Sequence, residues 1–316
     1  MAILVGVDEA GYGPTLGPLV ITAVAFEVKD HEVDGNLWQI LKGAVVGATS
    51  KSPLHVAVAD SKRLYASGRG LRRLEVGVLA FQGCIGDIGD FKRLLEALHC
   101  YDEGQLKLYP WYHDMQLSLP LTAAEGLARY RKLLEEVLSS QGIRFVGARA
   151  SVTSPYEFNK GIDSCGNKAL LLFDNCVKLM SSLWEEYPQL EILCDRHGGR
   201  NRYATLLSSA FSKCKVNVLS EGPDASSYEL RDGPRRLKVS FIIRAEDKHL
   251  PVALASMYSK YLRELFLKLF NKYWQERLPG LKPTAGYPND ARRFLRDIDG
   301  TKASLGMSDE ILIRDR

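Results

Sequence analysis

The sequence has 316 residues, and 42 lysines and arginines stand against 38 aspartates and glutamates, so the formal net charge is +4. Hydrophobic residues make up 46% and charged residues 25%, values typical of globular proteins, which exclude a disordered or fibrous chain. No apolar run approaches the roughly 18 residues of a membrane span, and the first residues lack a signal-peptide pattern. The six scattered cysteines form no C-x-x-C pair, which excludes a zinc ribbon and indicates reduced thiols in the cytoplasm.

The first half of the chain predicts two strands followed mainly by helices. Runs rich in β-branched residues at 3–7 and 19–28, separated by a turn of glycines and prolines, indicate an antiparallel strand pair. We expect helices at 71–81, 91–98, 123–138 and 168–184, and one further strand at 143–152. Residues 100–120 show no clean period and are interpreted as a loop.

The second half of the chain alternates strands and helices. Strands are expected at 190–194, 216–219 and 237–244, and helices at 203–211, 252–273 and 291–298. This order predicts an α/β fold with a mixed central β-sheet flanked by helices. We expect a single domain over 1–316, with a C-terminal helical part at 250–316, and a monomer.

Carboxylates at strand ends are candidates for a functional site. Asp8 and Glu9 end the first apolar strand and run into a turn that contains Gly11 and Gly13. Because neighbouring side chains of a strand point to opposite faces, both acids reach one site only if the backbone bends, and the glycines permit such a bend. For an isolated motif of this kind, a hairpin turn with solvated acids is the alternative.

A third acid, Asp195, follows another strand of the buried type, and ligand sites in open α/β sheets gather at strand carboxyl ends. It opens a loop with Arg196, His197 and Arg200, just before an expected helix N-terminus, where backbone N–H groups favour anions. The loop is interpreted either as a solvated basic loop or as one that handles phosphate.

The expected helix at 252–273 carries a fourth acid. Ser256, Lys260 and Glu264 are spaced by four and share one stripe, although Lys260 and Glu264 also fit a plain exposed ion pair. Together the four acids predict an oxygen site for Mg²⁺ or Mn²⁺. Two such ions activate water and stabilise the leaving oxygen in phosphodiester hydrolysis.

Four segments resemble motifs of the type 2 ribonucleases H (ribonucleases HII and HIII). Residues 6–14, GVDEAGYGP, with the Gly-Pro at 17–18 resemble the opening motif, and DSKRL at 60–64 resembles the D-S-K-x-L segment. The stretch ALASMYSKYLRE at 253–264, preceded by Asp247 and Lys248, is similar to the A-A-A-S-I-x-A-K-x-x-R-D helix, and GYP at 286–288 resembles a C-terminal G-Y motif. The motifs occur in the family's order, so the resemblance covers most of the chain.

The resemblance implies a ribonuclease H-like fold and metal-dependent cleavage of the RNA strand of RNA/DNA hybrids, or of ribonucleotides embedded in duplex DNA. The ends left by the cut would be a 5′-phosphate and a 3′-hydroxyl. The family's catalytic and metal-binding acids would fall on Asp8, Glu9, Asp195 and Glu264. Lys62 would approach a phosphate near the cut, Tyr287 would pack against the sugar at the ribonucleotide–DNA junction, and residues 98–138 would be an insertion.

One departure from the family lies in the opening motif. Tyr12 stands where the family has Arg or Lys, a residue that reads the 2′-hydroxyl at the junction together with the backbone of Gly11 and Gly13. Tyrosine stacks or donates one hydrogen bond, but it cannot pair with a phosphate. Glu264 replaces an Asp of ribonuclease HII, and it still offers a pair of oxygens to a metal.

The loop after Asp195 departs furthest from the family. We interpret Arg196 and Arg200 as phosphate contacts, because guanidinium groups bind phosphate in a bidentate manner. His197 is a candidate to protonate the leaving group, since an imidazole titrates near neutral pH. Lys260 is a further candidate for substrate contact.

Two other function classes remain open. A nucleic-acid-binding protein on the same fold, with lost or altered nuclease activity, is favoured by Tyr12 and the changed loop, whereas four carboxylates facing a polyanion argue against binding alone. A phosphotransferase of the actin-like superfamily ranks below both. The residues after Asp8 do not fit its D-x-G-x-T loop, and no Walker A motif occurs.

Overall fold

The computed structural model describes residues 1–33, 35–50, 52–65, 70–122 and 125–314. Its centre is a seven-stranded mixed sheet in the order β5-β2-β1-β6-β9-β8-β7. The strands of this sheet are β1 (Ala2–Ala10), β2 (Leu19–Val28), β5 (Arg144–Thr153), β6 (Gln189–Asp195), β7 (Lys215–Glu221), β8 (Ala225–Asp232) and β9 (Arg235–Ile242). A separate parallel pair consists of β3 (Val45–Val46) and β4 (Val56–Ala57).

Three neighbouring strands in the middle of the sheet run parallel. β1 pairs with β6, and β6 pairs with β9, in parallel register. The outer strands pair in antiparallel register: β2 with β1, β5 with β2, β8 with β9, and β7 with β8. The carboxyl ends of β1, β6 and β9 therefore lie along one edge of the sheet, which is where ligand sites of such sheets form.

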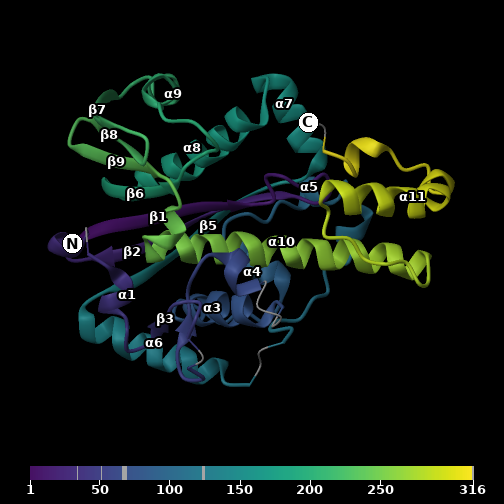
Figure 1. Ribbon diagram of the computed structural model, residues 1–316, viewed down its shortest axis with the longest axis horizontal. Helices are drawn as coiled ribbons and strands as arrows, with labels where there is room; N and C mark the ends of the chain where they lie inside the picture. Colours follow the sequence, from purple (N-terminus) through teal and green to yellow (C-terminus); the bar gives the residue numbers. More distant parts are fainter. Residues whose placement is uncertain (34, 51, 66–69, 123–124, 315–316) are drawn as a thin grey trace.

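Helices cover both faces of the sheet (Figure 1). The long helix α10 (Leu250–Arg277) runs along one face, with α3 (Arg72–Gly83), α4 (Phe91–Ala97) and α6 (Leu127–Gln141) beyond it. The other face is covered by α8 (Lys168–Glu186) and α9 (Ala204–Ala210). The sheet thus separates two hydrophobic cores.

The alternation of side chains along β1 supplies both cores. Leu4 belongs to the core beneath α10, whereas Ile3 and Val5 belong to the core beneath α8. Gly6 lies against α10, and a Cβ added there would stand 2.1 Å from the carbonyl carbon of Pro251. Only glycine therefore lets the helix approach the strand this closely.

The remaining helical elements are short or lie at the periphery. They are α1 (Leu37–Ile40), α2 (Ser61–Tyr65), α5 (Glu103–Leu106), α7 (Pro155–Cys165), α11 (Pro288–Ser304) and the 3₁₀ turns η1 (Asp30–Glu32), η2 (Pro110–Tyr112), η3 (Ala245–Asp247) and η4 (Asp309–Ile311). Among the helices of the described ranges, none combines the length and the apolar character that crossing a membrane requires.

The predicted α/β architecture, a mixed sheet flanked by helices, is confirmed. The strand expected at 19–28 has those bounds, whereas β8 and α7 were not predicted. Residues 123–124 of the helix expected at 123–138 lie outside the described residues, and so do residues 315–316 of the C-terminal helical part. That part contains α10 and α11, and α10 is a central element of the core.

Residues 98–138, predicted as an insertion, pack into the core beside α10. The ring of Trp111 contacts Phe270, and that of Tyr112 contacts Phe266, with centroids 5.1 Å apart in each pair. The side chains of Trp111 and Tyr112 are both buried. The segment is thus part of the hydrophobic core.

The same segment satisfies a buried carboxylate. Glu75 of α3 is fully buried, and its oxygens accept hydrogen bonds from the backbone N–H groups of Leu121 and Thr122 at 2.6 Å. The hydroxyl of Thr122 donates at 2.6 Å, and that of Tyr261 on α10 donates at 2.8 Å. Four donors therefore replace water around a carboxylate that would be costly to bury alone.

Candidate active site

Four carboxylates lie at the edge where the three parallel strands end. Asp8 and Glu9 are near the end of β1, and the parallel register places Asp195, the last residue of β6, beside Asp8. Glu246 is in η3, shortly after β9. We call Asp8, Glu9, Asp195 and Glu246 the acidic site.

Hydrogen bonds from the backbone and from α10 orient these side chains. Asp8 Oδ1 accepts from the backbone N–H of Glu9 at 2.8 Å, and Asp195 Oδ1 accepts from the N–H of Ala245 at 3.0 Å. The hydroxyl of Ser256, on the buried side of α10, also hydrogen-bonds to the side chain of Asp8. The two aspartates are therefore held by neighbours on either side of the sheet edge.

Three carboxylates of the acidic site have raised pKa values. Burial, together with repulsion from Glu9 and Asp195, raises the pKa of Asp8 well above its usual range. Burial raises the pKa of Glu9 to about 7 and the pKa of Glu246 to about 7, and the charge of Asp195 adds to both shifts. Each shift shows that these groups ionise at a cost unless positive charge is brought to them.

The donor atoms of the acidic site are all carboxylate oxygens, the ligands that hard divalent cations prefer. Within the described ranges, no three of these carboxylates have oxygens that all lie within 4.8 Å of one another. Three of them would have to rotate inward to share a single ion. The ligand chemistry of the site thus fits Mg²⁺ or Mn²⁺.

Lys62, predicted to contact substrate, lies beside the acidic site. Burial lowers the pKa of Lys62, but the carboxylates of Asp60, Asp8, Glu246 and Glu9 outweigh this effect, so the pKa is raised. Its ammonium group stays charged and reaches solvent from α2. The ammonium group of Lys62 therefore places a positive charge, accessible to solvent, beside the acidic site.

Glu264, predicted as the fourth metal ligand, is directed elsewhere. Its oxygens accept hydrogen bonds from Lys260 Nζ at 2.6 Å and from the hydroxyl of Tyr65 at 2.9 Å. Ser256 is the residue of this stripe that reaches Asp8, and Glu264 lies eight residues further, roughly 12 Å along the helix axis. We therefore replace Glu264 by Glu246 in the candidate metal site, and Lys260 serves as the partner of Glu264.

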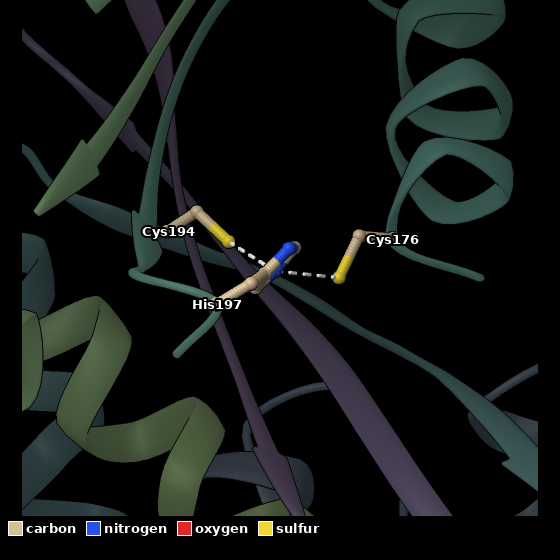
Figure 2. A group of neighbouring side chains, drawn as sticks. All are labelled: Cys176, Cys194 and His197. Atoms are coloured by element: carbon tan, nitrogen blue, oxygen red, sulfur yellow. Dashed lines mark hydrogen bonds between the residues drawn. The ribbon is translucent and has the colours of Figure 1, made fainter. Parts of the chain in front are cut away.

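His197, predicted as a proton donor to the leaving group, is only 3% exposed. Figure 2 shows its ring between two cysteines, with Nε2 at 3.4 Å from Cys176 Sγ and at 3.6 Å from Cys194 Sγ. Its charge still interacts with Glu9. The imidazole thus lies behind the acidic site, and its Nε2 is directed at sulfur.

The turn after β1 has the bend that the glycines were expected to permit. Gly11 has a φ of +91°, and a Cβ added there would stand 2.5 Å from the carbonyl oxygen of Pro18. The guanidinium of Arg263, which is 1% exposed, donates to the carbonyl oxygen of Leu16 at 3.1 Å. Gly13 is exposed, with open space around it. A side chain of α10 therefore holds the turn in place through a hydrogen bond to its backbone.

Tyr12 lies near two cations and one acid. The Nζ of Lys168 stands 4.8 Å from the centroid of its ring. Burial and the charge of Glu9 raise the pKa of Tyr12, whereas the charge of Arg200 opposes the shift. The phenol therefore stays protonated close to the acidic site.

The two arginines predicted to contact phosphate differ in their surroundings. Arg196 donates to Asn201 Oδ1 at 2.7 Å and to the carbonyl oxygen of Pro223 at 2.5 Å, so its guanidinium is engaged within the loop. Arg200 lies near Tyr12, and within the described chain the Nε atoms of both arginines are buried without a hydrogen-bond partner. Only Arg200 is thus placed beside the turn after β1.

Tyr287 is brought next to the same turn. The carbonyl oxygen of Gly286 accepts hydrogen bonds from the N–H groups of Thr15 at 2.8 Å and Leu16 at 3.1 Å. The side chain of Tyr287 is 51% exposed. The predicted G-Y motif therefore presents an aromatic side chain beside the glycine turn.

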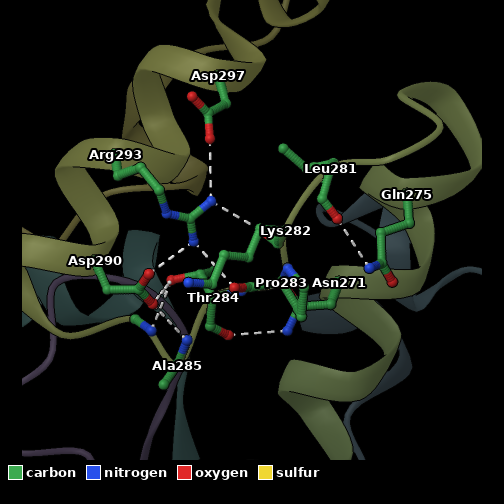
Figure 3. Close-up of polar contacts among 11 residues, drawn as sticks. Asn271, Gln275, Leu281, Lys282, Pro283, Thr284, Ala285, Asp290, Arg293 and Asp297 are labelled. Atoms are coloured by element: carbon green, nitrogen blue, oxygen red, sulfur yellow. Dashed lines mark hydrogen bonds and ion pairs between the residues drawn. The ribbon is translucent and has the colours of Figure 1, made fainter.

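The segment that carries Tyr287 is tied down by polar contacts (Figure 3). Asn271 exchanges two hydrogen bonds with the backbone of Thr284, at 2.9 and 2.8 Å. Asp290 accepts from the hydroxyl of Thr284 at 2.6 Å and from the N–H of Ala285 at 2.8 Å, while Arg293 donates to Asp290 at 2.7 Å. These bonds fix the approach of the segment to the turn.

A late segment of the chain also clamps the turn. Ile313 forms an isolated antiparallel bridge with Leu16, and the N–H of Arg314 donates to the carbonyl oxygen of Thr15 at 3.0 Å. The guanidinium of Arg314 donates to the carbonyl oxygen of Pro14. Three successive residues of the turn, Pro14, Thr15 and Leu16, are thus held by contacts from beyond residue 285.

Glu246 was missed by the sequence interpretation, although a signal for it was present. It follows a predicted strand, as Asp8, Glu9 and Asp195 do. Because β9 is the third parallel strand of the sheet, its carboxyl end meets the same edge. An acid shortly after a third strand was therefore a better candidate than an acid within a helix.

Among known proteins, only solved structures are similar to this chain. A scan of protein-family models finds no match to the chain, and a search of curated proteins finds none. Solved structures do match. The PCNA–RNase HII complex from Archaeoglobus fulgidus matches over 99% of this chain and 94% of the other, with 16% identity and a TM-score of 0.42.

Two further solved structures are similar. The ribonuclease H2 from Pyrococcus horikoshii OT3 matches over 98% of this chain and 92% of the other, with 15% identity and a TM-score of 0.37. Bst-RNase HIII in complex with Mn²⁺ matches over 99% of this chain and 66% of the other, with 15% identity and a TM-score of 0.42. The chain resembles the type 2 ribonucleases H.

Proposed function

We propose that this chain is a metal-dependent endoribonuclease that hydrolyses the RNA strand of RNA/DNA hybrids or ribonucleotides embedded in duplex DNA. The observation that carries the proposal is the meeting of four carboxylates at the edge where β1, β6 and β9 end. The raised pKa values of Asp8, Glu9 and Glu246 mark a site where like charges are held together at a cost to the fold. Such a cost is typical of functional sites.

The acidic site is the proposed binding site for the divalent cations. When bound there, Mg²⁺ or Mn²⁺ supplies an activated water and neutralises charge on the leaving oxygen. Asp8, Glu9, Asp195 and Glu246 are the proposed ligands. The N–H of Ala245 keeps Asp195 oriented, and a hydroxyl of α10 does the same for Asp8.

Lys62 is the proposed phosphate contact nearest to the cut. Its ammonium group is charged and accessible beside the carboxylates. Placed there, it offsets the repulsion between a nucleic-acid backbone and the acidic side chains. Cutting by water would leave a 5′-phosphate and a 3′-hydroxyl.

The surroundings of Tyr12 support a nucleic-acid substrate. Its phenol donates or accepts one hydrogen bond, which suits a 2′-hydroxyl. Lys168 and Arg200 stand beside the ring and bring the positive charge that tyrosine lacks. Tyr287 adds an exposed aromatic face on the other side of the same turn, for packing against a sugar.

Cleavage of labelled duplexes tests the proposal. One duplex carries a single ribonucleotide, one a long RNA stretch, and one only DNA, each incubated with Mg²⁺ or Mn²⁺. We expect cutting at RNA positions by the wild type, a loss of at least roughly 100-fold in Asp8→Asn and Glu246→Gln, and near-normal cutting by Glu264→Gln.

The pattern of the variants separates the outcomes. Cutting that survives Glu246→Gln but not Glu264→Gln would contradict the metal site described above. Tight binding of the hybrid by wild type without cutting of any duplex would instead identify a nucleic-acid-binding protein on this fold.

A further inference from the structure

Two cysteines and a histidine form a buried cluster behind the acidic site (Figure 2). Cys176 comes from α8, Cys194 from β6, and His197 from the loop that follows β6. The cysteines are each 1% exposed. The Nε2 atom and the two Sγ atoms all lie within 4.8 Å of one another. Side chains from three different elements thus bring two sulfur atoms and one nitrogen atom close together.

The spacing of these atoms matches the ligand shell of a tetrahedral zinc ion. Zinc binds histidine nitrogen at about 2.0–2.1 Å and cysteine sulfur at about 2.3 Å, so a nitrogen and a sulfur ligand stand about 3.6 Å apart. The Nε2 atom of His197 lies 3.4 Å from Cys176 Sγ and 3.6 Å from Cys194 Sγ. These two nitrogen–sulfur distances are therefore close to those of a zinc ligand shell.

The imidazole is held in the orientation that ligation requires. Its ring packs edge-on against Phe173, Tyr203 and Phe241, at centroid distances of 6.3, 5.9 and 5.6 Å. The backbone N–H of His197 donates to the hydroxyl of Tyr203 at 3.1 Å. Within the described chain Nδ1 has no hydrogen-bond partner. The proton of a neutral ring can therefore sit on Nδ1, which leaves the lone pair of Nε2 facing the sulfurs.

The chemistry of the donors selects the metal. Thiolate and imidazole ligands favour Zn²⁺, whereas Mg²⁺ and Mn²⁺ prefer oxygen. We propose that Cys176, Cys194 and His197 bind one Zn²⁺ ion, which ties α8 to the end of β6 directly behind Asp195. On binding, both thiols release their protons to solvent. This zinc site is separate from the proposed nuclease function, because none of its three protein ligands belongs to the acidic site.

Three protein ligands leave a fourth position open, as in zinc sites that hold a water or a substrate group. The charge of Glu9 interacts with both Cys176 and His197. A water molecule suits this fourth position. The ion would place a fixed positive charge next to Glu9 and the acidic site.

Metal analysis of the full chain tests the proposal. The protein is produced with added zinc, dialysed against metal-free buffer with a phosphine reductant, and analysed by inductively coupled plasma mass spectrometry. We expect one zinc per chain in the wild type, in the Asp8→Asn/Glu246→Gln double variant and in the thiol control Cys214→Ser. In Cys176→Ser and Cys194→Ser we expect zinc affinity to fall by more than the roughly 10–100-fold that loss of an outer-shell partner costs.

Replacement by Co²⁺ gives a second readout that does not depend on the variants folding. The wild type should show thiolate-to-cobalt charge-transfer absorption and the visible bands of tetrahedral cobalt. The absence of both zinc and these bands in the wild type would overturn the proposal. So would full zinc content in Cys176→Ser, or loss of zinc in the Asp8→Asn/Glu246→Gln variant, which would place the ion at the acidic site.

Discussion

The raised pKa values of the acidic site predict how the stability of the chain depends on pH. Glu9 and Glu246 have pKa values of about 7 in the folded chain, above the ordinary glutamate value of 4.5. Between these two values the folded chain keeps protons that the unfolded chain has lost. The free energy of unfolding therefore falls as the pH rises from about 4.5 to about 7, and this contribution levels off above that.

The size of the effect follows from the shift. A shift from 4.5 to about 7 corresponds to about 3 kcal/mol for one carboxylate. The two shifts share the charge of Asp195 and do not add in full, so we expect about 3 kcal/mol for the pair. With about 2.1 cal/mol/K of unfolding entropy per residue, a chain of 316 residues loses roughly 5 °C in Tm for this amount.

Thermal melts followed by circular dichroism at pH 5, 6, 7 and 8 measure this fall. Glu9→Gln removes one of the two ionisations and should flatten the curve, whereas Glu264→Gln should keep the slope of the wild type. Groups that lie away from Glu9 are common to all three proteins, so the difference between curves reports Glu9 together with Asp8 and His197, whose pKa values its charge raises. Mg²⁺ should raise the Tm more at pH 8 than at pH 5, because it binds the ionised carboxylates. Equal slopes in wild type and Glu9→Gln would refute the reasoning.

Three other substitutions test single contacts. Glu75→Gln should lower the free energy of unfolding by about 2–4 kcal/mol, because hydrogen bonds to a charged buried acceptor are lost; urea melts measure this against the exposed control Glu276→Gln, and equal stability would contradict it. Gly11→Ala should lower the free energy of unfolding by at least about 1 kcal/mol, because the φ of +91° at this residue suits only glycine. Gly13→Ala, with open space around the added Cβ, should have the same melting temperature as the wild type. Lys62→Met should reduce the slope of log binding constant against log salt concentration by about one released ion. Fluorescence anisotropy at several salt concentrations measures this slope, and an unchanged slope would show that Lys62 makes no phosphate contact.

Strand patterns in the sequence were sufficient to predict most of the sheet and three of the four acids. Asp8, Glu9 and Asp195 directly end apolar strands, and parallel pairing brings such ends together. β8, which lies between β9 and the edge strand β7, was missed because its polar residues and short turns carry little apolar pattern. α7 begins at Pro155, which fixes the first turn of a helix but reads in sequence as a break.

The error over Glu264 has a geometric cause. A spacing of four identifies residues on one face of a helix, and Ser256 of that face does reach Asp8. Spacing alone does not show how far along the helix axis the acidic site extends. At about 1.5 Å per residue, Glu264 lies roughly 12 Å from Ser256 and therefore beyond the site. The burial of His197 was equally out of reach, because it depends on the stacking of Tyr203 on Phe241, two residues from distant segments.

The clamp on the turn after β1 sets an order of events during synthesis. Pro14 and Arg314 are 300 residues apart in the chain. At about 5–20 residues per second, a ribosome needs roughly 15 to 60 s to travel from one to the other. During that interval a nascent chain can form the β1–β2 hairpin, but it lacks the partners that hold the turn beside Tyr12. The surface proposed to bind nucleic acid is therefore completed only when residues 313 and 314 have emerged from the ribosome.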